Sequence, residues 1–68
     1  MRQVMMSKDE RGFWYVECPS LPGCATQGAT QEEALSNIKE AIILYIEALE
    51  EKGLPVPEEK FVSAVLVV

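Results

Sequence analysis

The side chains that could do chemistry in this chain are eleven carboxylates and two cysteines, because histidine is absent. A cysteine nucleophile needs a base within reach, and the most common base is missing. A metal-dependent nuclease holds two cations about 4 Å apart between carboxylates at fixed strand positions, yet only Glu17 falls within a predicted strand. A structural zinc site needs four cysteine or histidine ligands, which the chain lacks. We therefore expect no catalytic, metal or cofactor site, and no enzymatic activity.

The two cysteines, Cys18 and Cys24, flank a turn rich in proline and glycine. We expect Cys18 to be a small buried hydrophobic residue, whereas Cys24 could be exposed beside Gly23. A disulfide between them would close only a short loop and stabilise little. Residues 1–10 show no signal peptide, and the longest apolar run, residues 64–68, is too short to cross a bilayer. We therefore expect a cytoplasmic protein with reduced thiols and no membrane association.

Short apolar segments separated by turn residues predict the fold. Residues 2–8, 13–18 and 24–28 favour strands, which pair antiparallel when they follow one another so closely. Thr30 and Glu33 fit a capping box that opens a helix, which runs to Lys52 and ends at Gly53. The apolar residues 61–68 favour a last strand, which a right-handed crossover would place parallel to the first. The expected fold is α+β, β-β-β-α-β, a single domain of residues 1–68 with a four-stranded, mostly antiparallel sheet in the order 3-2-1-4 and one helix on one face.

The chain has more apolar side chains than this fold can bury. A stripe at helical spacing should face the sheet: Ala34, Leu35, Ile38, Ala41, Ile42, Tyr45 and Leu49. Ile43 and Leu44 lie outside it, although isolated surface residues of this kind are ordinary. Both faces of residues 13–18 and 61–68 are apolar, and one helix covers only one face of the sheet. We therefore expect a homo-oligomer, dimer or tetramer, that associates through Trp14, Val16, Phe61, Val62, Val65, Leu66 and Val67.

The net charge of −5 favours a basic protein partner. It disfavours nucleic acid, since an acidic surface repels the phosphate backbone. Glu40, Glu47 and Glu50 surround Ile43 on the outer side of the predicted helix. We therefore predict that these four residues form the partner-binding patch.

The most distinctive segment is residues 19–34, PSLPGCATQGATQEEA. It resembles the hallmark of the HicB-like antitoxins in these positions: Pro19, Leu21, Pro22, Gly23, Cys24, Thr26, Gly28, Thr30, Glu32, Glu33 and Ala34. This resemblance implies a partial ribonuclease H-like fold. It also implies a type II toxin–antitoxin pair, in which the domain binds and masks a small basic RNA-cleaving toxin of the HicA type. Physically the matched residues serve the fold, with Leu21 plugging the space under the turn.

Many HicB-like antitoxins carry a C-terminal ribbon-helix-helix or helix-turn-helix segment that binds operator DNA. No such segment follows the domain in this sequence, so we expect no DNA binding by this chain alone. The alternative to an antitoxin is a stand-alone homo-oligomeric structural domain whose toxin has been lost.

Overall fold

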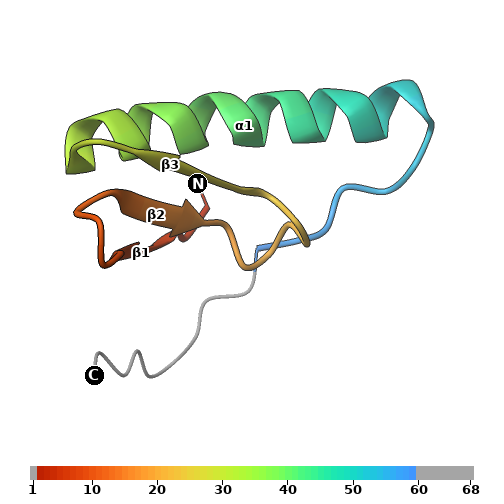
Figure 1. Ribbon diagram of the computed structural model, residues 1–68. Coiled ribbons are helices and arrows are strands. Elements are labelled where there is room, and N and C mark those ends of the chain that lie inside the picture. Colours follow the sequence, from red (N-terminus) through yellow and green to blue (C-terminus); the bar gives the residue numbers. More distant parts are fainter. Residues whose placement is uncertain (1, 60–68) are drawn as a thin grey trace.

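The computed structural model describes residues 2–59, which form a three-stranded sheet followed by one helix (Figure 1). The elements are β1 (Met5–Lys8), β2 (Trp14–Glu17), β3 (Ala25–Gly28) and α1 (Gln31–Glu51). The strands pair antiparallel in the order β1-β2-β3, with Tyr15 opposite both Ser7 and Gln27. The predicted α+β class and the meander that precedes the helix are confirmed. The predicted fourth strand, residues 61–68, lies outside the described residues, so the complete order 3-2-1-4 stays a prediction.

The strands are shorter than the sequence predicted. β1 begins at Met5 rather than Arg2, β2 covers Trp14–Glu17 rather than residues 13–18, and β3 begins at Ala25. At the end of β2 the amide of Cys18 still donates to the carbonyl of Cys24, at 2.9 Å. Pro19 follows and has no N–H to donate, so the chain leaves the ladder there.

Local sequence signals set both ends of α1. Thr30 has an extended backbone (φ −129°, ψ 165°), and its hydroxyl accepts from the amide of Glu33 at 3.1 Å. The cap at Thr30 is therefore confirmed, although the return bond from Glu33 to the Thr30 amide is absent in the described part of the chain. The helix ends at Glu51, one residue earlier than predicted, and Gly53 takes the left-handed conformation (φ 70°) expected after a helix end.

The core lies between the sheet and α1, which runs along one face of β2 and β3 (Figure 1). Its buried residues are Val16, Cys18, Leu21, Cys24, Ala34 and Ile38. Two residues of the predicted stripe, Ala34 and Ile38, are fully buried, and Ala41, Ile42 and Tyr45 pack against the core. Leu35 was predicted to face the sheet but is 38% exposed. The prediction for Leu35 was wrong because α1 lies over β2 and β3, and its flank toward β1 stays open.

The helix is much longer than the strands it covers. α1 has 21 residues and each strand has 4. At about 1.5 Å per helical residue and about 3.3 Å per strand residue, the helix is more than twice as long as the strands. Its C-terminal half therefore extends past the sheet (Figure 1).

Candidate partner-binding surfaces

The turn between β2 and β3 contains most of the hallmark residues, and contacts inside the chain hold it. The side chain of Leu21 is fully buried, its amide donates to the Cys18 carbonyl, and its carbonyl accepts from the Cys24 amide, both at 3.0 Å. Gly23 has φ 80°, a conformation that favours glycine. The hydroxyl of Tyr45 on α1 donates to the Pro22 carbonyl at 2.8 Å. Leu21 is therefore the plug that the sequence predicted.

The remaining hallmark positions also serve the fold. Gly28 is buried, and a Cβ there would lie 2.5 Å from the backbone nitrogen of Ala34, so only glycine allows α1 to approach β3 this closely. Thr26 is half-buried opposite Val16, and Pro19 is exposed. Cys24 is only 5% exposed, so the expectation that it could face solvent was wrong. The turn folds inward on Leu21 and takes Cys24 into the core with it.

A polar cluster joins the two ends of the described chain. The guanidinium of Arg2 donates to the Ser20 hydroxyl at 3.0 Å and to the Pro57 carbonyl at 2.6 Å. Ser20 in turn donates to the carboxylate of Glu59 at 2.9 Å, and Arg2 lies 3.8 Å from the same carboxylate. No local pattern predicts this cluster, because its members Arg2, Ser20, Pro57 and Glu59 lie far apart in the chain.

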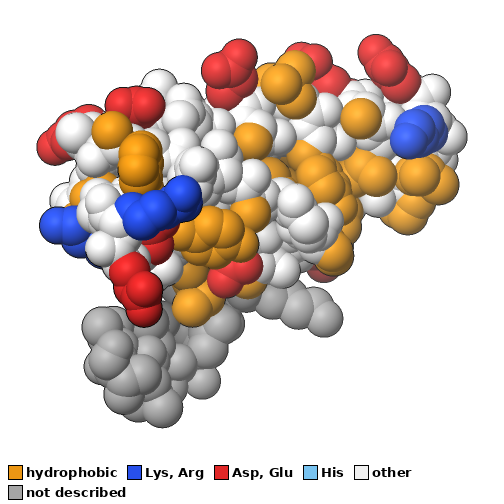
Figure 2. All heavy atoms as spheres, in the orientation of Figure 1, with side chains coloured by type: hydrophobic (Ala, Val, Ile, Leu, Met, Phe, Trp, Pro, Cys, Tyr) orange, Lys and Arg blue, Asp and Glu red, His pale blue; other side chains and the backbone are white. Residues whose placement is uncertain are grey.

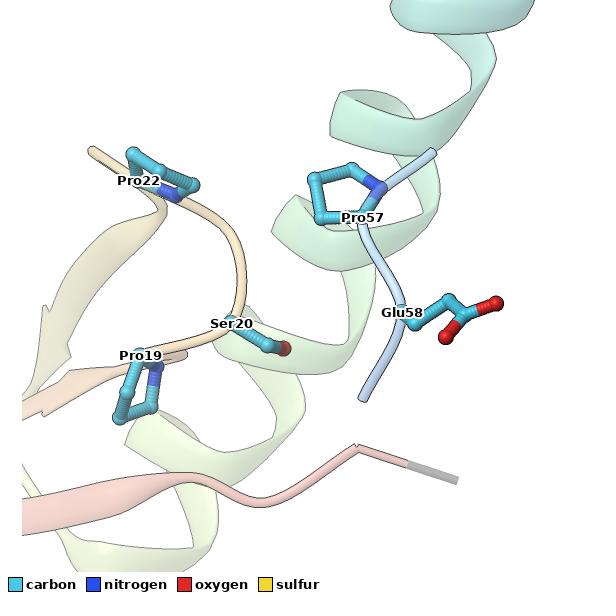
Figure 3. Close-up of a pocket in the computed structure, with 5 residues that line it drawn as sticks. All are labelled: Pro19, Ser20, Pro22, Pro57 and Glu58. Atoms are coloured by element: carbon cyan, nitrogen blue, oxygen red, sulfur yellow. The ribbon is translucent and has the colours of Figure 1, made fainter. Parts of the chain in front are cut away.

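A hollow of about 550 Å³ lies beside this cluster and is lined by Pro19, Ser20, Pro22, Pro57 and Glu58. In Figure 3 the Ser20 side chain points from the turn toward the segment that carries Pro57 and Glu58. A serine next to a carboxylate could suggest a nucleophile with its base. Here the carboxylate of Glu59 also lies 3.8 Å from Arg2, and the Ser20 hydroxyl accepts from the same guanidinium, so both groups already have structural partners. The cluster is therefore a tether between the turn and the segment after α1.

The predicted partner-binding patch lies on the outer side of α1. Glu40, Ile43, Glu47 and Glu50 are all exposed, and Ile43 is 57% exposed. Their spacing of three or four residues places them on one side of the helix. Figure 2 shows acidic side chains along the outer rim of α1 with apolar side chains between them. The ion pairs among the described residues, Arg2–Glu59 and Arg11–Asp9, leave these glutamates unpaired.

An apolar groove adjoins this patch on the flank of α1 that faces β1. It encloses about 530 Å³, and Ile43 belongs to both surfaces. The groove is lined by Arg2, Val4, Leu35, Ile38, Lys39, Ile42, Ile43 and Ile46. Helical periodicity did not reveal this groove, because it placed Leu35 against the sheet, whereas Leu35 is 38% exposed and lines the groove. The signal that could have revealed it is the length of the helix, which exceeds what three short strands can cover.

The sheet face opposite α1 is a third exposed surface. Met5 is 49% exposed and Tyr15 is 42% exposed there. The sequence predicted Trp14 and Val16 as self-association residues, but Val16 is fully buried and Trp14 is half-buried against the core. That prediction was wrong for these two residues, because α1 covers the face to which they point. The other predicted self-association residues, Phe61, Val62, Val65, Leu66 and Val67, lie outside the described residues.

No three histidine, cysteine, aspartate or glutamate side chains come together as a possible metal site within residues 2–59. Over the same residues, no helix is both long and apolar enough to span a membrane.

A family model described as the HicB-like antitoxin of bacterial toxin–antitoxin systems matches residues 3–67. The chain belongs to the HicB-like antitoxin family. The resemblance carried by residues 19–34 is thereby confirmed. Because the hallmark residues hold the turn and the helix start, they identify the family through its fold.

Relatives of this HicB-like chain occur in distant organisms. It is 52% identical to a UPF0150 protein of Thermoplasma acidophilum over 56 residues, which cover 82% of this chain and 81% of the relative. It is 48% identical to a UPF0150 protein of Synechocystis over 59 residues, which cover 87% of this chain and 75% of the relative.

Among solved structures, the HicB-like chain is similar to the N-terminal domain of the Burkholderia pseudomallei antitoxin HicB. The two superpose with a TM-score of 0.73 at 31% sequence identity, over 91% of this chain and 69% of that chain. The likeness in fold therefore extends over most of the domain.

Proposed function

We propose that this HicB-like chain is an antitoxin-type binding module that sequesters a small basic RNA-cleaving toxin of the HicA type. Membership of an antitoxin family supports a toxin as the kind of partner. The observation that carries the proposal is the patch on α1, where Glu40, Glu47 and Glu50 surround the exposed side chain of Ile43 without a cation of the described chain to pair with them.

The chemistry of the patch suits a basic partner. A toxin that cleaves RNA needs cations to approach the phosphate backbone, and the net charge of −5 on this chain attracts such a surface from a distance. Charge complementarity of this kind raises the association rate and selects the partner. Ile43 supplies the apolar centre that excludes water once contact is made, as the anchor residues of interfaces do.

A charge-reversal experiment tests this proposal. The chain is co-expressed with a small basic RNA-cleaving toxin of the HicA type, and binding and rescue of growth are measured. The variant Glu40→Lys/Glu47→Lys should weaken binding at least about tenfold, or about 1.4 kcal/mol. The control Glu10→Lys/Glu58→Lys changes the net charge equally away from α1 and should bind nearly as well as the wild type. Equal loss in both variants would place the toxin elsewhere, and no binding by the wild type would refute the antitoxin role.

The second candidate function is a self-associating structural domain without a toxin. The exposed apolar side chains of Met5 and Tyr15 on the open sheet face favour it, because large exposed apolar patches on soluble proteins often mark interfaces. Sedimentation measured over a range of concentrations separates the alternatives. A homo-oligomer should dissociate on dilution and should be weakened by Tyr15→Glu, whereas a monomer at every concentration would exclude this candidate.

The proposed fold includes the fourth strand, residues 61–68, beside β1. Two hydrogen bonds support this strand: Arg2 donates to the Pro57 carbonyl, and Ser20 donates to the Glu59 carboxylate. They keep the segment before residue 60 close to the start of the chain, which leads into β1. The amide of Asp9 donates to Phe13, so with antiparallel alternation the amides of Met6 and Lys8 point away from β2. Hydrogen exchange at Met6 and Lys8 should therefore be slower in the full chain than in a chain that ends at Glu59. Equal exchange rates would argue against a strand at this edge.

The proposal also includes binding without catalysis, a cytoplasmic location and no DNA binding by this chain alone. The absence of histidine and the negative net charge support the first and the last of these. Purified chain should leave RNA uncut in the presence of Mg²⁺ or Mn²⁺, and it should not shift a DNA fragment from its own promoter. Metal-dependent cleavage that disappears in Glu17→Gln would overturn the non-catalytic part.

A further inference from the structure

Cys18 and Cys24 are direct partners across the ladder of β2 and β3. The last registered pair of that ladder is Glu17 with Ala25, and the next pair outward is Cys18 with Cys24. The Cys18 amide donates to the Cys24 carbonyl at 2.9 Å, whereas the Cys24 amide donates to the Leu21 carbonyl at 3.0 Å, so one of the two bonds of an antiparallel pair is formed. The Cα atoms of directly opposite residues lie about 4.5–5.5 Å apart, and disulfides span Cα separations of about 4.4–6.8 Å. The fold therefore holds the two cysteines at a distance that one S–S bond can bridge.

The pair is enclosed but is adjacent to a small hollow. Both cysteines are free thiols, 2% and 5% exposed, and they are the only cysteines of the chain. Both line a hollow of about 120 Å³ beside Tyr15, Leu21 and Pro22. That volume is on the order of four water molecules, at about 30 Å³ each. A hollow of that volume has room for hydrogen peroxide.

We propose that Cys18 and Cys24 form a reversible intramolecular disulfide when a small peroxide oxidises the folded chain. One thiol loses its proton and its thiolate attacks a peroxide oxygen; the O–O bond breaks, a sulfenic acid forms, and the leaving hydroxide takes up that proton as the first water. The second thiol attacks the sulfenic sulfur, the S–S bond forms, and the second water leaves. The peroxide takes up the two electrons that the thiols lose. Two molecules of a thiol such as glutathione reverse the reaction and leave as glutathione disulfide.

Oxidation of this pair would affect the contacts of Ser20 with Arg2 and Glu59. The sulfur of Cys18 lies 3.4 Å from the Ser20 hydroxyl, which accepts from Arg2 and donates to Glu59. Disulfide formation removes the S–H donor of Cys18 and fixes the turn whose Pro22 carbonyl binds Tyr45. This inference is independent of the toxin, because it concerns only the chemistry of the turn.

The pH dependence of the reaction follows from the environment of Cys24. Burial raises the pKa of the Cys24 thiol, and the neighbouring Cys18 raises it further. Glu17 is the charged residue that lines the hollow beside Cys24, and no lysine or arginine lines this hollow. The reactive thiolate is therefore scarce at neutral pH, and oxidation should accelerate as the pH rises toward the range of the free thiol.

Mass spectrometry of the full chain after peroxide treatment tests the proposal. The folded wild type should lose the mass of two hydrogen atoms, lose both sites for alkylation and keep its helical circular dichroism and its state of association. Reduced glutathione should restore both alkylation sites. If the folded chain stays a dithiol under oxidation that converts the urea-unfolded chain to the disulfide, the fold keeps the thiols apart and the proposal fails. Sulfinic acid or a cross-linked dimer as the main product would also overturn it.

A matched variant tests whether the pairing of β2 with β3, or only the short distance along the chain, brings the two thiols together. In Cys24→Ala/Ala25→Cys the second thiol moves by one residue, which turns it to the opposite face of the sheet. Ala25 is exposed and can accept the thiol, whereas Cys24→Ala removes a buried sulfur from the core, so the helical circular dichroism of the variant is measured before oxidation. We expect this variant to form roughly tenfold less intramolecular disulfide than the wild type, because the two thiols then lie on opposite faces of the sheet. Equal yields would show that the short loop, and not the ladder, brings the thiols together.

Discussion

In the β2–β3 turn the side chains and backbone are held by partners inside the chain, whereas on the outer side of α1 the side chains face solvent. Leu21 is fully buried and the Pro22 carbonyl binds Tyr45. On α1, by contrast, Ile43 is 57% exposed and Leu44 is 58% exposed. The two regions are joined through Tyr45, which belongs to the helix and fastens the turn.

The difference shows which residues can report on function. The hallmark residues of the turn have structural partners, so their presence identifies the fold and says little about the surface that binds a partner. The carboxylates of the α1 patch have no ion-pair partner among residues 2–59, and they do not contribute to the core. Changes in the turn should therefore lower stability, and changes on the outer side of α1 should alter binding while stability stays the same.

The largest expected loss of stability is at the plug. Leu21→Ala removes a fully buried side chain and leaves a cavity, which typically costs about 2–5 kcal/mol. A domain of this size has about 3–10 kcal/mol in total, so much of the population should unfold. The control Leu44→Ala removes the same atoms from an exposed site and should change stability by less than about 0.5 kcal/mol. Urea unfolding followed by circular dichroism measures the free energy of unfolding of both variants. Equal losses would show that the turn contributes no more to stability than the outer side of α1.

A smaller loss is expected where α1 approaches β3. In Gly28→Ala the added Cβ would lie 2.5 Å from the Ala34 nitrogen, and because backbone cannot rotate away, the helix must shift. Such overpacking costs about 1–3 kcal/mol. Gln27→Ala, at the exposed neighbouring position, should stay within about 0.5 kcal/mol of the wild type. If Gly28→Ala unfolds at the wild-type urea concentration, the close approach is not a constraint.

The helix cap should give a still smaller effect. Thr30→Ala removes the acceptor of the Glu33 amide and should lower the free energy of unfolding by about 1 kcal/mol. Thr30→Ser keeps the hydroxyl and should restore most of this loss. Thermal unfolding of the three chains measures the difference, and a loss in Thr30→Ser as large as in Thr30→Ala would exclude the hydroxyl as the cause.

The sequence was a good guide wherever a structure depends on neighbouring residues. The cap at Thr30, the left-handed Gly53 and the plug at Leu21 were all predicted, because each follows from a few residues and from the turn or helix that they enter. The strands were recognised from their apolar residues and turns. Their ends were predicted too far out, because the hydrogen bonds of a turn decide where a ladder stops.

The sequence was a poor guide wherever a structure depends on the position of α1 over the sheet. Alternation separated Trp14 and Val16 from Phe13 and Tyr15, but it could not say which face the helix would cover. Periodicity likewise assigned Leu35 to the core, although this residue lines an open groove. The cluster of Arg2, Ser20 and Glu59 depends on tertiary packing alone and has no local signal.

The smallest expected effect on stability is at the β1–β2 turn. This turn is also held by hydrogen bonds within the chain, so it tests whether such bonds stabilise a turn without a buried side chain. Desolvation raises the pKa of the Asp9 carboxyl, but the amides of Phe13 and Arg11 and the Arg11 guanidinium outweigh it, so the pKa lies below its usual value of 3.8. Because the pKa is lowered on folding, the contribution of Asp9 to stability is complete above the unfolded pKa and is lost as the pH falls through the folded pKa.

Asp9→Asn should therefore be less stable than the wild type at neutral pH, and the two unfolding curves should converge in acid. Glu10→Gln removes the same charge from the exposed neighbour of Asp9 and should show less convergence. Urea midpoints measured from neutral pH to below the usual Asp9 pKa of 3.8 provide the test. Parallel curves for Asp9→Asn and the wild type would mean that the amide bonds to Asp9 do not depend on its charge, and that this turn is held by backbone geometry alone.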